Sequence, residues 1–302
     1  APIVMLGLML VWTATSSALR APPWVLLSKY AAAPSVPRMN TLMLLGLALG
    51  GALAPYLGVV LKNADPRLPF ALSSLTLLAA TAGIIFIERR LKLSPLALPS
   101  ATPQAPTDVA GKSWPFLAGL LLLAVGFQVH FSVNTAAQFL RFSGSDGLQW
   151  LMPVFWIGFG VAMMPGGALC KRFGPLQVMT VSAMVGVVGV YVAAIAGSLD
   201  VLIAAQVVAG GAWGSMLMCA FTAAMAAGRS GREGFSLGLM FAVLAAATLS
   251  RIATVMSGVH KQPELAAILS WTPAVCWLVG AVLVGVLAYR EYFKRNLNPA
   301  AA

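Results

Sequence analysis

Long apolar stretches, each ended by a few polar residues, follow one another along the whole chain. A helix needs about 20 mostly apolar residues to cross a bilayer. Nine stretches meet that length, at about residues 2–28, 39–61, 69–88, 115–140, 150–170, 176–197, 200–228, 234–257 and 265–290. The pattern therefore predicts an all-α membrane protein with nine transmembrane helices.

Composition supports a membrane protein and argues against a nucleic-acid-binding one. The 302 residues are 60% hydrophobic and only 9% charged, and the mean hydropathy is +0.89. The net charge of +11 comes from cations spread over short loops rather than gathered on one polar face, so we expect no nucleic acid as a partner. The three cysteines have no metal-ligand or redox spacing, and we expect neither a bound metal nor a cofactor.

One polar interval divides the chain. Residues 89–113 are rich in Pro, Ala, Ser and Thr and lack helical periodicity, which is typical of an extended linker. This predicts three parts: a partial N-terminal helical bundle of three spans (1–88), a linker (89–114) and a C-terminal bundle of six spans with a tail (115–302).

The loops predict the orientation. Thirteen Lys and Arg residues fall in one set of alternate loops and the C-terminal tail, whereas the opposite set holds only Lys62, Arg67, Arg141 and Lys261. Cytoplasmic loops accumulate Lys and Arg, so the linker and the C-terminus are expected in the cytoplasm, with a bacterial inner membrane as the location. With nine spans Ala1 would then lie outside, and we expect the native N-terminus to lie upstream.

A short basic segment follows the fifth span, which is predicted to stop at the Pro-Gly-Gly break that begins at Pro165. The letters Gly-Ala-Leu-Cys-Lys-Arg-Phe-Gly resemble the Gly-x-Leu-x-Asp-Arg/Lys-x-Gly loop signature of the major facilitator superfamily of secondary transporters, with a lysine in place of the usual aspartate. The resemblance implies a conformational loop made of Gly167, Leu169, Lys171, Arg172 and Gly174. An ordinary positive-inside turn is the alternative.

The second span resembles another signature. Its GLALGGALAPYLG is similar to the Gly-x-x-x-Gly-Pro-x-x-Gly-Gly motif in the fifth helix of exporters of this superfamily, with Ala54 and Val59 replacing two glycines. Small residues at this spacing favour close helix packing, and a proline kinks the helix. The residues concerned are Gly46, Gly50, Gly51, Pro55 and Gly58.

The resemblance also implies an architecture. The superfamily has twelve helices in two six-helix bundles joined by a long cytoplasmic loop. On this basis the nine spans of this chain resemble helices four to twelve, and the first three helices are missing.

Polar residues at membrane depth are expensive and usually face a cavity. Gln128, His130 and Arg251 are the clearest cases, and Asn134 is expected to share the helix face of His130. Gln206 and Trp213 flank a glycine pair and are added as lining residues. Together they predict a polar, cationic substrate site. The alternatives are a satisfied interhelical hydrogen bond for His130 and snorkelling for Arg251.

These observations lead to one preferred function and two alternatives. We expect secondary active transport of a small solute by alternating access, with an organic anion or a polar metabolite as substrate, in a monomer that uses protons or another coupling ion. The alternatives are an exporter of hydrophobic drug-like compounds and a non-transporting membrane scaffold or assembly factor. An enzyme is not expected, because the sequence has no phosphate-binding loop and no nucleophile with an arranged base.

Overall fold

The computed structural model describes residues 20–65, 67–91, 109–228 and 232–297, together with Val4, Gly7, Leu8 and Val11. Within this part every regular element is a helix. The long helices are α2 (Ala21–Tyr30), α3 (Val36–Ala64), α4 (Leu68–Leu91), α5 (Val109–Val129), α8 (Pro153–Phe173), α9 (Pro175–Ile195), α10 (Leu199–Gly228), α11 (Glu233–Met256) and α12 (Pro263–Leu297). The short ones are α6 (Thr135–Leu140), α7 (Leu148–Leu151), the π-helical turn η2 (His130–Asn134) and the 3₁₀ turns η1 (Ala33–Ser35), η3 (Ser145–Gly147) and η4 (Val259–Lys261).

The helices match the predicted spans. Eight helices of the described part are long and apolar enough to cross a membrane, and they coincide with the second to ninth predicted spans. The first predicted span, residues 2–28, lies mostly outside the described residues, and α2 begins at its end. The helices also extend into the predicted linker, because α4 runs to Leu91 and α5 begins at Val109.

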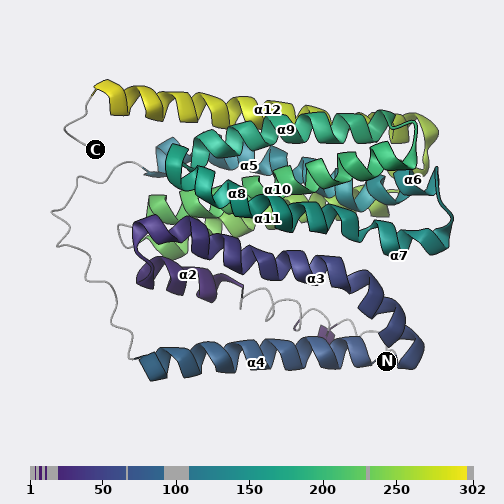
Figure 1. The fold of residues 1–302 in the computed structure, drawn as a ribbon, viewed down its shortest axis with the longest axis horizontal. Coiled ribbons are helices and arrows are strands. Elements are labelled where there is room, and N and C mark those ends of the chain that lie inside the picture. Colours follow the sequence, from purple (N-terminus) through teal and green to yellow (C-terminus); the bar gives the residue numbers. More distant parts are fainter. Residues whose placement is uncertain are drawn as a thin grey trace.

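Helix α10 forms the centre of the group made by α5 to α12 (Figure 1). It packs against α8, α9 and α11. Of its most apolar 18-residue stretch 72% is buried, the largest share among the eight candidate spans of the described part. Glycines bring α8 and α10 into backbone contact. A Cβ at Gly158 would meet the backbone of Val207, and one at Gly210 would meet that of Phe155. This close approach leaves no room for a larger residue at either position.

Helix α8 does not stop at the Pro-Gly-Gly sequence, so the predicted break is wrong. The helix continues through Pro165 to Phe173, and the next helix begins at Pro175. Pro165 lies on the exposed face, and ending a helix within the apolar layer would leave backbone groups unsatisfied. The turn consists of Gly174 alone, whose φ of 96° is in the region that only glycine adopts readily.

Helices α3 and α4 lie on one side of the C-terminal group, with α3 between that group and α4 (Figure 1). Helix α3 packs along α8 and also contacts α10. Helix α4 contacts α3, and its Glu88 accepts a hydrogen bond of 3.2 Å from Tyr30 of α2. None of the most apolar stretch of α4 is buried among the described residues. A Cβ at Gly51 would meet the Trp156 indole, whereas no described residue lies within 4 Å of one at Gly46, Gly50 or Gly58. Packing of those three glycines against another helix stays a prediction.

Candidate functional site

The first polar group of the bundle surrounds His130. Its Nε2 lies 3.0 Å from Oε1 of Gln206, and an amide oxygen can only accept, so Nε2 carries the proton. The Gln206 amide nitrogen in turn donates to Thr135 Oγ1 at 3.3 Å and to Gln138 Oε1 at 3.1 Å. His130 is 1% exposed and Gln206 is fully buried. The group therefore forms a closed network between η2, α6 and α10.

A π-helical turn separates His130 from Asn134. The carbonyl of His130 accepts from the backbone N–H and from Oγ1 of Thr135, five residues later. The Asn134 amide donates to the Leu269 carbonyl of α12 at 2.9 Å, while His130 contacts Gln206 of α10. The two side chains therefore have partners on different helices, and a shared part in a substrate site stays a prediction.

The second polar group joins η2 and α5 to α11. Gln128 donates to Thr248 Oγ1 at 3.0 Å, and its carbonyl oxygen lies 3.5 Å from the Ser132 hydroxyl. The Arg251 guanidinium donates to Ser132 at 3.4 Å. All four side chains are half-buried. We call Gln128, Ser132, Thr248 and Arg251 the arginine network.

The arginine network has spare hydrogen-bonding capacity. A guanidinium carries five N–H donors, and among the described residues Ser132 is the hydrogen-bond partner of Arg251. Its remaining donors match the two oxygens of a carboxylate or phosphate group. Ser132 and Thr248 were not predicted, although Ser132 follows Gln128 by four residues and Thr248 precedes Arg251 by three. This helical spacing is the signal that could have found them.

Trp213 belongs to an aromatic core rather than to either polar group. It stacks on Phe127 with ring centroids 4.6 Å apart and lies 6.4 Å from the Trp277 ring. Trp213 is 3% exposed, and the Trp277 indole nitrogen donates to the Leu123 carbonyl at 2.8 Å. The six predicted site residues are thus divided: Gln128 and Arg251 share one half-buried network, and the other four are buried elsewhere in the C-terminal group.

The residues of the predicted conformational loop lie at the end of α8. Leu169, Lys171 and Arg172 are exposed, and the Arg172 guanidinium lies 5.1 Å from the Phe173 ring centroid. Gly167 is buried against α3, where a Cβ would stand 2.8 Å from Thr41 Oγ1. The segment is therefore helical up to Phe173, with one face directed to α3 and its cations outward.

Three helices meet beside this segment. The Asn40 amide of α3 donates to Thr222 Oγ1 of α10 at 2.9 Å, and no described residue is a hydrogen-bond partner of its buried Oδ1. Nearby on α10, Phe221 stacks on Trp24 of α2 with centroids 3.7 Å apart and an interplanar angle of 7°. We call this region the helix junction: α3 contacts α8 and α10 there, and Trp24 of α2 contacts Phe221 of α10.

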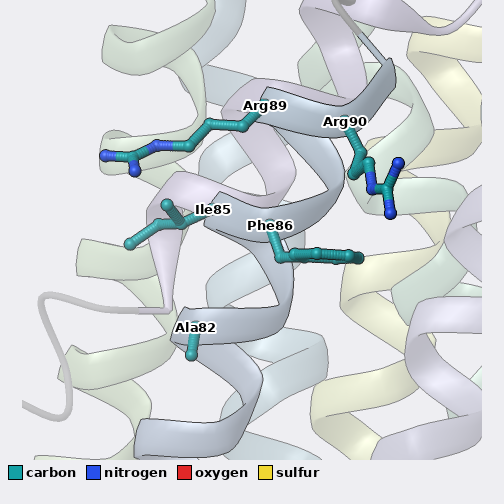
Figure 2. A pocket seen from close by; sticks show the side chains of 5 residues that line it. All are labelled: Ala82, Ile85, Phe86, Arg89 and Arg90. Carbon is teal, nitrogen blue, oxygen red and sulfur yellow. The ribbon is translucent and has the colours of Figure 1, made fainter.

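A surface pocket of about 460 Å³ lies at the C-terminal end of α4 (Figure 2). It is lined by Ala82, Ile85, Phe86, Arg89 and Arg90, and the Arg90 guanidinium lies 5.7 Å from the Phe86 ring centroid. The pocket contains none of the predicted site residues. Exposed cations at the end of a membrane helix are typical of anchoring at the lipid interface.

Comparison with known proteins supports the fold. No protein-family model matches the sequence, and no curated protein matches it. The chain is similar to the crystal structure of a bacterial homologue of the iron transporter ferroportin in an outward-facing state, with a TM-score of 0.61 at 16% identity. The match covers 86% of this chain and 65% of the other, so this chain spans somewhat less than two thirds of that protein.

The fold defines a class of protein. This chain is an all-α, multi-pass membrane protein with the helix arrangement of a major facilitator transporter. Eight helices of the described part are candidate membrane spans, and the first predicted span lies largely outside the described residues.

Proposed function

We propose that this protein carries out secondary active transport of a small organic anion or polar metabolite by alternating access. The observation that carries the proposal is the arginine network, in which a half-buried guanidinium within a membrane span keeps donors available. Charged groups at this depth are costly, and a transported anion would offset that cost during binding. The proposal excludes an enzymatic role.

The chemistry of the network favours an anion over a metal cation. Arg251 repels cations, while Gln128, Ser132 and Thr248 offer neutral groups suited to hydroxyl or amide substituents. The described residues contain no group of three His, Cys, Asp or Glu side chains that could hold a metal ion. The iron named for the structural relative is therefore not the cargo that these residues favour.

The helix junction supplies the moving contact in this proposal. The Trp24–Phe221 stack and the Asn40–Thr222 hydrogen bond join α2 and α3 to α10, across the division between the two proposed bundles. Because these residues lie near the basic ends of α3 and α8, the positive-inside rule assigns the junction to the cytoplasmic side. Its closure corresponds to an outward-facing state, and its separation would release substrate inside.

The test is transport by the full-length protein in proteoliposomes, with radiolabelled lactate, succinate and citrate as probes. We expect uptake of at least one probe, loss of more than tenfold with Arg251→Ala, and partial retention with Arg251→Lys. Arg290→Ala, at an exposed site on α12, is the matched control and should transport normally. Equal uptake by the Arg251→Ala variant would overturn the anion site, and no uptake by the wild type would overturn the substrate class.

Export of hydrophobic compounds is a second candidate. It is favoured by α3, where Pro55 lies between Gly50 and Gly58, two positions with open space beside them. Deletion of the protein in a drug-sensitised host distinguishes the two candidates. Increased susceptibility to lipophilic dyes would favour export, whereas unchanged susceptibility combined with carboxylate uptake would favour the first proposal.

A further inference from the structure

Three sulfur-bearing side chains gather at the helix junction. Cys170 of α8 is 3% exposed, and Cys219 and Met218 of α10 are fully buried. All three belong to the main hydrophobic cluster of the protein. Neither the arginine network nor the transport proposal uses them.

The helix register brings the two thiols together. A Cβ at Gly166 of α8 would stand 2.9 Å from Ser215 Oγ and 3.7 Å from the Met218 methyl group of α10. One turn later on each helix come Cys170 and Cys219, which therefore face each other across the same contact. The same register places Thr222, three residues after Cys219 on α10, near the two thiols.

Thr222 connects the thiols to the third sulfur and to α3. Its hydroxyl donates to the Met218 carbonyl at 2.9 Å and lies 3.8 Å from the Met218 thioether sulfur. The same oxygen accepts the Asn40 amide, whose Oδ1 is buried without a partner among the described residues. Thr222 thus links the Met218 thioether of α10 to Asn40 of α3, on the side of α10 where the helix register places the two thiols.

We propose that Cys170, Cys219 and Met218 form a binding site for one soft monovalent metal ion, Cu(I) or Ag(I). Thiolate and thioether sulfurs select such ions, whereas harder divalent cations prefer oxygen or imidazole ligands. Binding replaces the protons of both thiols: M⁺ and two R–SH give an R–S–M–S–R unit of charge −1, and two protons leave to solvent. The Met218 thioether adds a neutral third donor. Oxidation states do not change.

The position of the site predicts its effect. Cys170 and Cys219 lie on helices that α3 covers when the junction is closed. A bound ion would therefore fix α8 to α10 directly beneath that contact. This proposal does not depend on which solute the protein transports.

Silver ion is the probe, because it keeps its oxidation state in aerobic buffer. Purified full-length protein is incubated with silver nitrate in chloride-free buffer, passed over a desalting column, and its silver content is measured by mass spectrometry. We expect one silver ion per chain in the wild type and in Cys276→Ser, which removes the half-buried cysteine of α12. Cys170→Ser and Cys219→Ser should each retain less than a tenth of that amount, and Met218→Leu should weaken binding about tenfold.

Two controls keep the test decisive. The elution volume and the melting midpoint identify variants that fail to fold. If Cys170→Ser or Cys219→Ser does not fold, Cys170→Ala or Cys219→Ala is tested in its place. Silver X-ray absorption of the wild type should show two or three sulfur ligands. Equal silver retention by the wild type and the Cys170 and Cys219 variants would overturn the site, as would loss of silver in Cys276→Ser or no silver in the wild type. Failure here leaves carboxylate uptake unaffected, so it is distinct from failure of the transport proposal.

Discussion

His130 illustrates how a buried polar residue depends on its neighbours. Replacing it with alanine leaves the Gln206 carbonyl oxygen without its donor inside the bundle. An unsatisfied buried group costs about 1–3 kcal/mol, so His130→Ala should lower the melting midpoint of the purified protein, and His130→Asn should recover part of the loss. His260→Ala is the control, because its Nδ1 is already buried without a partner. Equal effects of both alanine variants would contradict the assigned network.

At the level of single residues, the sequence identified the polar positions but not their partners. Gln128, His130 and Arg251 stand out because polar groups are rare within apolar spans. His130 contacts Gln206 of α10 while Asn134 contacts Leu269 of α12, and these partners depend on how three helices pack together, which a single sequence does not show. Trp213 stacks on Phe127, and its part in a substrate site stays a prediction, because an aromatic residue beside glycines packs equally well in a core or against a ligand.

The contact between α8 and α10 makes a prediction about whole helices. A methyl group at Gly210 would collide with the Phe155 backbone and push the two helices apart, so Gly210→Ala should destabilise the protein by about 1–3 kcal/mol. Gly46→Ala is the matched control on α3, where the added methyl meets nothing within 4 Å and alanine favours the helix by about 0.5–1 kcal/mol. Melting in detergent should therefore shift in opposite directions for the two variants.

A result in which both glycine variants are neutral would show that the two helices can separate freely, and would contradict the central role of α10. The measurement should be repeated at two detergent concentrations, because the detergent changes the medium around the exposed face of α3.

Helix positions could be predicted closely because the membrane limits the choices. Lipid leaves no partner for unpaired backbone groups, so each apolar run must continue as a helix until it reaches the interface. The same rule explains the one wrong helix end. Proline and two glycines end many helices in water, but α8 passes through Pro165 and reaches Gly174 before the chain turns.

At the scale of the whole molecule, we expect the contacts of the helix junction to control how often it opens. Removing the Trp24 ring abolishes its stack on Phe221, so Trp24→Ala should weaken the contact of α2 with α10 and increase the time that the junction is open. In a Cys276→Ser background, labelling of the buried Cys170 by a hydrophilic maleimide should accelerate severalfold. Trp114→Ala, at a 64% exposed site on α5, should leave the labelling rate unchanged. Equal acceleration in both variants would rule out a specific contact.

The overall fold could be predicted from the sequence, whereas the contacts between side chains of different helices could not. Nine apolar runs and a degenerate basic segment were sufficient to indicate a major facilitator fold, and the structural likeness confirms that fold. Nothing in the sequence indicated that Asn40 would reach Thr222, 182 positions further along the chain. Such contacts follow from the packing of the helices, which depends on the shapes of many side chains together.

The single-residue connection between α8 and α9 restricts how these helices can move. Phe173 ends one helix and Pro175 begins the next, and the proline ring holds its own φ nearly constant. Only the two backbone torsions of Gly174 can rotate readily between the two helices, which have 21 residues each. The connection therefore has two rotational degrees of freedom, so a tilt of α8 beyond what these two torsions can absorb must turn α9 as well.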